Sequence, residues 1–241
     1  MFSLGGPGIR GRGQRGNDQY TKLLLHCDGA DASTTFTDSS ASAHTVTVAG
    51  NAQIDTAQSV FGGASGLFDG TADELTVADH ADFEIGAGEF TIDLRVRFNS
   101  IPAEGSGGAM TFMQKGTVGG SNLSFIFRLF DATVRKLNLI VSADGTTLNV
   151  NIGNAWTPSL NTWYHVAVVR TGTTVRMFID GTQLGSDETV STTFFSGSGI
   201  VGVGSNSVGA NVIDGWIDEF RFSKEIARWT ANFTPPSAPY F

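Results

Sequence analysis

Residues 90–98 read FTIDLRVRF, the most regular alternation of apolar and polar side chains in the sequence. Every second residue from Phe90 to Phe98 is apolar, and the residues between them are Thr, Asp, Arg and Arg. Because successive side chains of a β-strand point to opposite faces, this pattern predicts a strand with one face on a hydrophobic core. The other face is predicted to meet solvent or to line a groove.

Similar short apolar runs follow one another along the chain, separated by turn signals. Asp-Gly pairs at 28–29, 144–145 and 180–181 are typical of tight turns. The one helical candidate is SKEIARWT (223–230). We count roughly ten to twelve strands, which predicts an all-β sandwich of two antiparallel sheets. The clearest runs are KLLLHCDG (22–29), LSFIFRLF (123–130), KLNLIVS (136–142), TLNVNI (147–152), TWYHVAVVR (162–170), TVRMFID (174–180) and GWIDEFRF (215–222).

The composition agrees with this class. The 241 residues include 31 Gly and 18 Phe, and 40% are hydrophobic, which is enough for the core of one large β domain. The single cysteine, Cys27, excludes an internal disulfide framework. No apolar run reaches the roughly 18 residues of a membrane span, and the first residues lack the apolar centre of a secretory signal. We therefore expect a soluble domain without a membrane partner.

Residues 1–20 form a Gly- and Arg-rich arm ahead of the domain, which we assign to residues 21–241. Arg10, Arg12 and Arg15 lie in the arm, whereas the whole chain has a formal charge of −8. The acidic body is therefore predicted to repel nucleic acid. The arm has no apolar periodicity, so it is either a flexible tail or a docking arm that becomes ordered on an acidic partner.

Five separated segments occur in an order that is known from one family of domains. They reach from Lys22 to Pro236, and in them the chain resembles the laminin-G-like, concanavalin A-like jelly-roll domains. The resemblance implies two curved antiparallel sheets with a concave face that often binds glycans. Related domains occur in lectins, in accessory modules of enzymes, and in bacteriophage tail and capsid proteins. The segments are LLLHCDG, GLFDGTADELTV, EFTIDLRVRF, NTWYHVAVVRTGTTVRMFIDGTQLG and GWIDEFRFSKEIARWTANFTPP.

An aspartate in the last predicted strand needs a counter-charge. If residues 215–222 form a regular strand, Asp218 shares a face with Trp216, Phe220 and Phe222. A carboxylate on an apolar face is unfavourable unless it is paired, hydrogen-bonded or bound to a metal. The resemblance implies a structural calcium ion here, and the matching positions are Asp218 and Asp28, with the carbonyl region around Asp69 and Gly70 as a weaker candidate. The alternative is that Asp218 pairs with an arginine or caps a turn.

Catalytic patterns are absent from the sequence. A glycoside hydrolase needs two cooperating carboxylic acids, and although Glu89 and Asp93 share a face of the predicted strand, Arg95 and Arg97 follow where a second acid would be wanted. No GxSxG nucleophile motif occurs. We therefore predict that the protein is not an enzyme.

The four histidines are not expected to bind zinc, because they show no short ligand spacing and one cysteine cannot complete a thiolate site. They are His26, His44, His80 and His165.

Two classes of function remain. The first and favoured class is a non-enzymatic structural or adhesion protein of a phage particle, homo-oligomeric and attached to other virion proteins through the arm. The alternative is a lectin module, secreted or on a cell surface, that recognises host or cell-surface carbohydrate. Its candidate stacking platforms are Trp156, Trp229 and Tyr240, although each of them is also a good packing residue.

Overall fold

The structure is a computed structural model and describes residues 17–241. The arginines of the arm, Arg10, Arg12 and Arg15, lie outside the described residues. Residues 17–241 fold into fifteen strands and one 3₁₀ turn, η2 (Ala81–Phe83). The all-β class is confirmed. The strand number exceeds the sequence-based count because several strands are very short: β3 (Gln53–Asp55) and β14 (Val201–Val203) have three residues each, and β2 (Val46–Ala49) has four.

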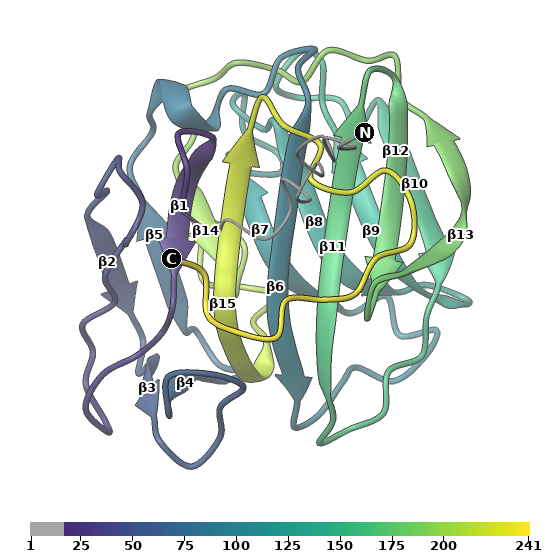
Figure 1. Ribbon diagram of the computed structural model, residues 1–241. Helices are drawn as coiled ribbons and strands as arrows, with labels where there is room; N and C mark the ends of the chain where they lie inside the picture. The colour runs from purple at the N-terminus through teal and green to yellow at the C-terminus, as the bar shows by residue number, and fades with distance from the viewer. Residues whose placement is uncertain (1–16) are drawn as a thin grey trace, which may run out of the picture.

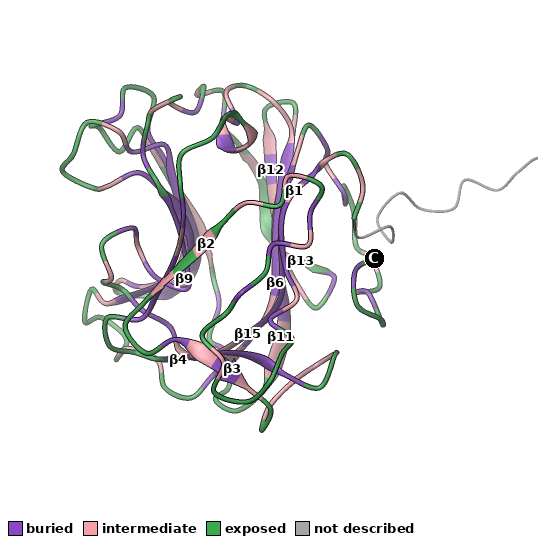
Figure 2. Ribbon diagram, turned by 90° about the vertical axis from the view of Figure 1, so that its left-hand side faces the viewer, coloured by how far each residue is buried: buried purple, intermediate pink, exposed green. Residues whose placement is uncertain are grey.

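The strands form two antiparallel sheets that pack face to face as two layers (Figures 1 and 2). The eight-stranded sheet has the order β13-β12-β11-β6-β15-β4-β3, and β1 also pairs with β15. Its strands are β1 (Thr21–Leu25), β3 (Gln53–Asp55), β4 (Ser65–Asp69), β6 (Phe90–Phe98), β11 (Trp163–Thr171), β12 (Thr174–Ile179), β13 (Thr182–Thr189) and β15 (Asp214–Lys224).

The second, seven-stranded sheet has the order β10-β9-β8-β7-β14-β5-β2. Several of its connections are hairpins, as the turn signals predicted, and β9 and β10 pair directly. Besides β2, its strands are β5 (Glu74–Val77), β7 (Ala109–Lys115), β8 (Phe125–Asp131), β9 (Arg135–Val141), β10 (Val150–Ala155) and β14 (Val201–Val203).

The core lies between the two sheets, where β6 contributes the apolar face predicted from its alternation. All five apolar side chains from Phe90 to Phe98 are fully buried. They meet the inward side chains of β7 and β8, and the rings of Phe98 and Phe112 lie 6.3 Å apart between centroids. The opposite face of β6 differs from the expectation, because Thr91 and Asp93 are fully buried as well.

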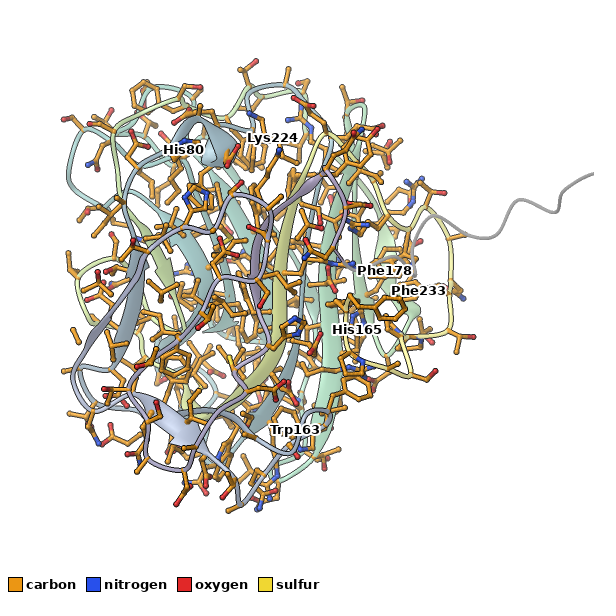
Figure 3. The ribbon with its side chains drawn as sticks, turned by 60° about the vertical axis from the view of Figure 1, so that its left-hand side comes forward. His80, Trp163, His165, Phe178, Lys224 and Phe233 are labelled. Atoms are coloured by element: carbon orange, nitrogen blue, oxygen red, sulfur yellow. The ribbon has the colours of Figure 1, made fainter. Side chains whose placement is uncertain are left out.

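Residues 225–241 bury that opposite face, because after β15 they cross the outer side of the eight-stranded sheet (Figure 1). Trp229 stacks on Phe233, with 4.0 Å between ring centroids. Phe233 in turn contacts His165 and Phe178 of the sheet, and Figure 3 shows these three side chains together. The carboxyl-terminal segment therefore covers the middle of the sheet.

The helix expected over residues 223–230 does not form. Ser223 and Lys224 complete β15 instead. Beyond them the backbone bonds to a side chain of the sheet, since Thr91 Oγ1 donates to Ile226 O (3.0 Å) and accepts from Arg228 N (3.0 Å). These contacts use backbone groups that a helix would need for its own hydrogen bonds.

Under this segment lies a buried ion pair. Asp93 accepts from Arg221 Nε (2.9 Å) and Nη2 (3.2 Å) and from the Tyr240 hydroxyl. Burial alone would raise the pKa of Asp93, but the Arg221 guanidinium outweighs it and holds that pKa well below its usual range. Asp93 is thus a fixed, inaccessible anion, which is unsuited to acid catalysis.

Candidate functional site

The last strand contains a β-bulge that changes the predicted orientation of Asp218. The register of β15 against β6 shifts between Asp218 and Arg221, and Glu219 has φ 50°. Asp218 is paired with Arg95 across the ladder, on the outer face, whereas Phe220 and Phe222 after the bulge point into the core. The prediction that Asp218 shares a face with these two phenylalanines was wrong, because an extra residue reverses the alternation.

The bulge lies where β15 changes its neighbour. The edge of β15 away from β6 pairs with β4 through Asp214–Ile217 and with β1 through Phe220–Ser223. Asp218 and Glu219 occupy the gap between these two ladders. The loop of residues 56–64 and the residues after β1 fill this gap, and they bring Asp28 and His26 beside the two acids.

One oxygen of Asp218 is satisfied and the other is not. Oδ2 accepts from Val60 N (2.7 Å) and Phe61 N (3.0 Å), so this carboxylate caps the loop. Oδ1 is buried and has no hydrogen-bond partner. Burial raises the pKa of Asp218 to about 7; the two N–H groups oppose this shift, and the charges of Glu219 and Asp28 add to it. The group therefore needs either a proton or a cation at neutral pH.

The neighbouring groups make this an acidic centre, defined here as Asp218, Glu219, Asp28 and His26. Glu219 Oε1 lies 2.7 Å from His26 Nδ1, and this hydrogen bond raises the pKa of His26 against the effect of its burial. Burial, together with the charge of Glu219, raises the pKa of Asp28. A Cβ on Gly62 would lie 1.7 Å from Asp28 Oδ1, so the loop packs directly on this carboxylate.

The structure separates Asp69 and Gly70 from the acidic centre. Asp69 pairs with Asp214 at one end of the β4–β15 ladder, whereas Gly66 pairs with Ile217 at the end next to Asp218. The two residues predicted as weaker calcium ligands instead line a pocket at the edge of the sandwich.

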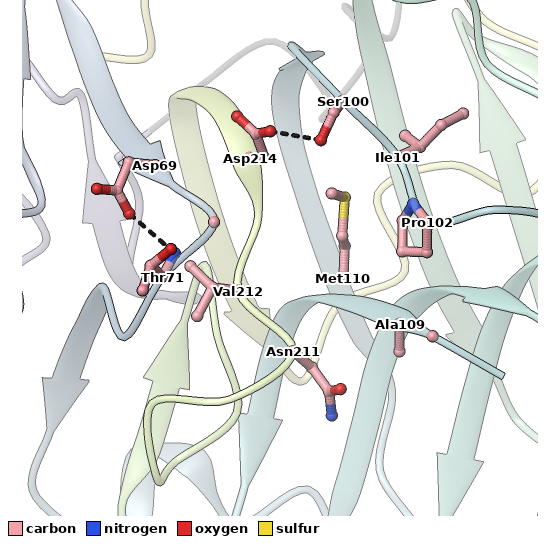
Figure 4. A pocket seen from close by; sticks show the side chains of 12 residues that line it. Asp69, Thr71, Ser100, Ile101, Pro102, Ala109, Met110, Asn211, Val212 and Asp214 are labelled. Carbon is pink, nitrogen blue, oxygen red and sulfur yellow. Dashed lines mark hydrogen bonds between the residues drawn. The ribbon is translucent and has the colours of Figure 1, made fainter. Parts of the chain in front are cut away.

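This loop-end pocket has a volume of about 500 Å³ and lies between the β4–β5, β6–β7 and β14–β15 connections (Figure 4). Apolar groups of Met110, Val212, Ile101 and Pro102 line it together with two carboxylates. Its full lining is Asp69, Gly70, Thr71, Ser100, Ile101, Pro102, Gly108, Ala109, Met110, Asn211, Val212 and Asp214.

Hydrogen bonds fix both carboxylates of the pocket. Asp214 accepts from Asn99 Nδ2 (3.1 Å) and from the Ser100 hydroxyl. Asp69 accepts from Thr71 N (2.8 Å) and Asn51 Nδ2 (3.0 Å). The pocket thus offers preorganised acceptors beside an apolar surface. Asp69 was predicted from the sequence only as a weaker calcium candidate and Asp214 was not singled out, so the sequence did not predict this pocket.

The three aromatic residues predicted as sugar platforms are packing residues. Trp156, Trp229 and Tyr240 are only 9%, 8% and 5% exposed. Trp156 lies edge-on to Tyr164, with 5.4 Å between centroids, and the Arg221 guanidinium lies 3.7 Å from the centre of the Tyr240 ring. Because a stacking platform must present an open ring face, the interpretation of these residues is corrected.

A second polar surface lies on the outer face of the seven-stranded sheet. Arg128 Nε donates to Asn138 Oδ1 (3.0 Å), and Asn138 Nδ2 donates to Asn151 Oδ1 (2.8 Å). Burial lowers the pKa of Arg128 to about 10, so its guanidinium is still charged at neutral pH. Because these side chains largely satisfy one another, the loop-end pocket is the stronger candidate for a ligand site.

Comparison with known families agrees with the architecture. The model of the concanavalin A-like lectin/glucanases superfamily matches residues 68–228, more than half of the chain. The chain therefore belongs to this superfamily. No curated protein matched the sequence. Within residues 17–241, no helix is long and apolar enough to cross a membrane.

Several solved structures share the fold at low sequence identity. The binding domain of Paraclostridial Mosquitocidal Protein 1 has a TM-score of 0.61 and 14% identity, over 87% of this chain and 50% of that one. The binding domain of Botulinum Neurotoxin DC in complex with SialylT has a TM-score of 0.57 and 14% identity, over 87% and 49%. The chain thus spans about half the length of these toxin binding domains.

A third similar structure matches over nearly its whole length. It is domain 4 of AbnA, a GH43 extracellular arabinanase from Geobacillus stearothermophilus, in complex with arabinotriose. The TM-score is 0.59 at 15% identity, and the match covers 86% of this chain and 93% of that domain. The shared unit is thus a lectin-like sandwich that can stand as one domain.

Proposed function

We propose that this protein is a non-catalytic carbohydrate-binding module that takes a neutral sugar in the loop-end pocket. The observation that carries the proposal is the pairing of two fixed carboxylates, Asp69 and Asp214, with the apolar side chains of Met110 and Val212 in one cavity. A sugar ring presents hydroxyl groups at its edge and C–H groups on its face, so it needs both kinds of surface. Ligand sites typically combine an apolar lining with a few convergent polar groups.

The charge of the pocket selects among sugars. Asp69 and Asp214 accept hydrogen bonds from hydroxyl groups but repel carboxylates and sulfates, and the chain as a whole carries −8. Removing a charge from water beside a like charge is unfavourable. Arabinotriose, bound in the similar arabinanase domain, is a neutral sugar of the kind that this pocket favours.

The same carboxylates support binding over hydrolysis. Glycoside hydrolysis needs one carboxyl group that delivers a proton and a second that acts as base or nucleophile. Asp69 and Asp214 each accept hydrogen bonds from two donors and are held as acceptors. Glu89 and Asp93, the pair weighed from the sequence, do not line the pocket.

We also propose that Asp218 holds a structural Ca²⁺ ion together with Asp28. Support comes from the buried, unpartnered Oδ1 of Asp218 and from the acids around it. Calcium takes six to eight oxygen ligands, and the three carboxylates of the acidic centre do not form a group of ligand atoms within 4.8 Å of one another in the described chain. Backbone carbonyls of residues 56–64 would therefore have to complete the shell. Such an ion would tie the end of β1 to β15.

A glycan array tests the sugar site. Wild-type protein is expected to retain neutral oligosaccharides and to lose them in Thr71→Trp, because Thr71 is exposed and lines the pocket. Thr173→Trp places the same ring on the exposed turn between β11 and β12 and is expected to keep binding. Equal binding by both variants, or no binding by the wild type, would contradict the proposal.

A further inference from the structure

Two histidines and an aspartate that are distant in sequence meet at one end of the sandwich. His44 lies just before β2, while His80 and Asp82 lie at the start of η2, and Figure 3 labels His80 there beside Lys224. His44 Nε2 and His80 Nδ1 each lie 3.2 Å from Asp82 Oδ2. All three ligand atoms fall within 4.8 Å of one another.

These separations fit the coordination sphere of a small metal ion. Bonds of about 2.0–2.1 Å from zinc to nitrogen or oxygen, set at tetrahedral angles, put neighbouring ligand atoms about 3.3 Å apart. Two of the three separations in this cluster are 3.2 Å. A metal ion can therefore be placed between the ligands with only small side-chain movements.

The supporting contacts orient the ligands. Ser42 Oγ donates to Asp82 Oδ2 (2.6 Å), and Asp38 Oδ2 accepts from His44 N (2.8 Å). The His44 ring also packs against Phe83, with 5.0 Å between centroids. Hydrogen-bond partners of this kind, which fix the orientation of a ligand, are usual around metal-binding side chains.

Two existing contacts oppose cation binding at this cluster and would have to be broken. Lys22 Nζ lies 3.8 Å from Asp82 Oδ1, and its side chain is partly exposed, so it can move into solvent. His80 Nδ1 accepts a hydrogen bond from Asp82 N (3.1 Å), which a metal bond would replace. The side chain of His80 is 55% exposed, and this opening leaves room for a water ligand.

We propose that His44, His80 and Asp82 form a Zn²⁺ site with three protein ligands and one water. Imidazole nitrogens combined with one carboxylate suit zinc, copper and nickel, whereas calcium and magnesium prefer all-oxygen shells. The ion joins the segment before β2 to the connection between β5 and β6. This site is separate from the sugar pocket and from the acidic centre, and it does not depend on either of them.

The test is a Zn²⁺ titration of untagged, metal-free, full-length protein by calorimetry, with Co²⁺ as the spectroscopic probe of geometry. We expect one strong site and the intense visible absorption of four-coordinate Co²⁺. His44→Gln, His80→Asn and Asp82→Asn are each expected to weaken zinc binding at least tenfold. Asparagine at position 80 keeps an acceptor for Asp82 N, so this variant removes the imidazole while preserving the turn.

His26→Gln is the matched control, because His26 also lies beside a carboxylate, that of Glu219. It is expected to bind zinc like the wild type. Three separate ligand variants keep the test decisive if one of them fails to fold, as judged from its melting temperature without metal. The proposal is overturned if the wild type binds zinc only in the millimolar range. It is also overturned if the three variants bind normally, or if only His26→Gln loses the metal.

Discussion

Replacing Asp218 by asparagine should remove a specific dependence of stability on pH. In the metal-free protein, the Asp218 carboxyl group has its ordinary pKa of 3.8 in the unfolded chain and a pKa of about 7 in the folded protein. A raised carboxyl pKa means that the folded state binds more protons, so stability falls as pH rises between these two values. A separation of about three pH units corresponds to about 4 kcal/mol lost by pH 7.5.

The asparagine variant keeps part of the site. Its amide oxygen can still accept from Val60 N and Phe61 N, while its NH₂ group takes the place of the unpartnered Oδ1. Burying that donor without a partner costs about 1–3 kcal/mol. At pH 7.5 without metal, Asp218→Asn is therefore expected to be about 1–3 kcal/mol more stable than the wild type, which carries the larger penalty of a buried charge.

Calcium should close this gap in stability. A cation at Oδ1 replaces the proton, and at a hundredfold excess over its dissociation constant it stabilises the fold by about 2.7 kcal/mol. The assay is urea unfolding from pH 4 to 8, with calcium and with chelator. His26, whose pKa is also raised, titrates in both proteins, so the difference between the two curves reports mainly Asp218.

Two results would refute this reasoning. A wild-type stability that does not fall between pH 4 and 7 in chelator would show that Asp218 does not carry the predicted proton. A chelator effect that persists unchanged in Asp218→Asn would place the cation elsewhere.

Further predictions concern the carboxyl-terminal cover and the arm. Asp93→Ala leaves Arg221 buried without its carboxylate and should lower the free energy of unfolding by about 3–5 kcal/mol, measured in urea; a loss under 1 kcal/mol would contradict the buried pair. Trp229→Ala should lower the free energy of unfolding by about 3–5 kcal/mol, because the Trp229 ring stacks on Phe233. Sugar affinity should stay unchanged, because Trp229 does not line the pocket. A folded Trp229→Ala protein that no longer binds sugar would show instead that Trp229 is a stacking platform. Deletion of residues 1–16 should leave the melting temperature unchanged and weaken attachment to a particle or partner, as the phage hypothesis predicts; an unfolded truncation would instead make the arm part of the domain.

Local patterns in the sequence predicted the strands well. The alternation of residues 90–98 reports the two faces of β6 directly, because side-chain direction in a strand has a period of two residues. The Asp180–Gly181 pair marks the β12–β13 hairpin, and both residues have positive φ, 49° and 75°, as its turn type requires.

Local sequence patterns could not predict the features that depend on contacts between distant residues. The orientation of Asp218 depends on a bulge at the point where β15 changes its neighbour from β4 to β1. No residue pattern in β15 predicts that change. Trp229 and Tyr240 look like available aromatic residues until the last segment folds back over the sheet.

The candidate binding sites could not be predicted from local sequence patterns either. His44 and His80 lie 36 positions apart, so a search for short ligand spacing could not pair them, although the loops before β2 and after β5 bring them together. Asp69 and Asp214 meet only because β4 and β15 are neighbours in the sheet. The acids were visible in the sequence, but their partners were set by topology.

The most direct measurement of the central proposal is an NMR titration of isotope-labelled protein with a neutral oligosaccharide, beside its anionic derivative. The proposal predicts saturable shifts of the backbone amides of Gly70, Thr71, Met110 and Asn211, with the neutral sugar binding more tightly than the anionic one. Shifts gathered instead around Arg128 and Asn151 on the outer face of the seven-stranded sheet, or a preference for the anionic sugar, would contradict it.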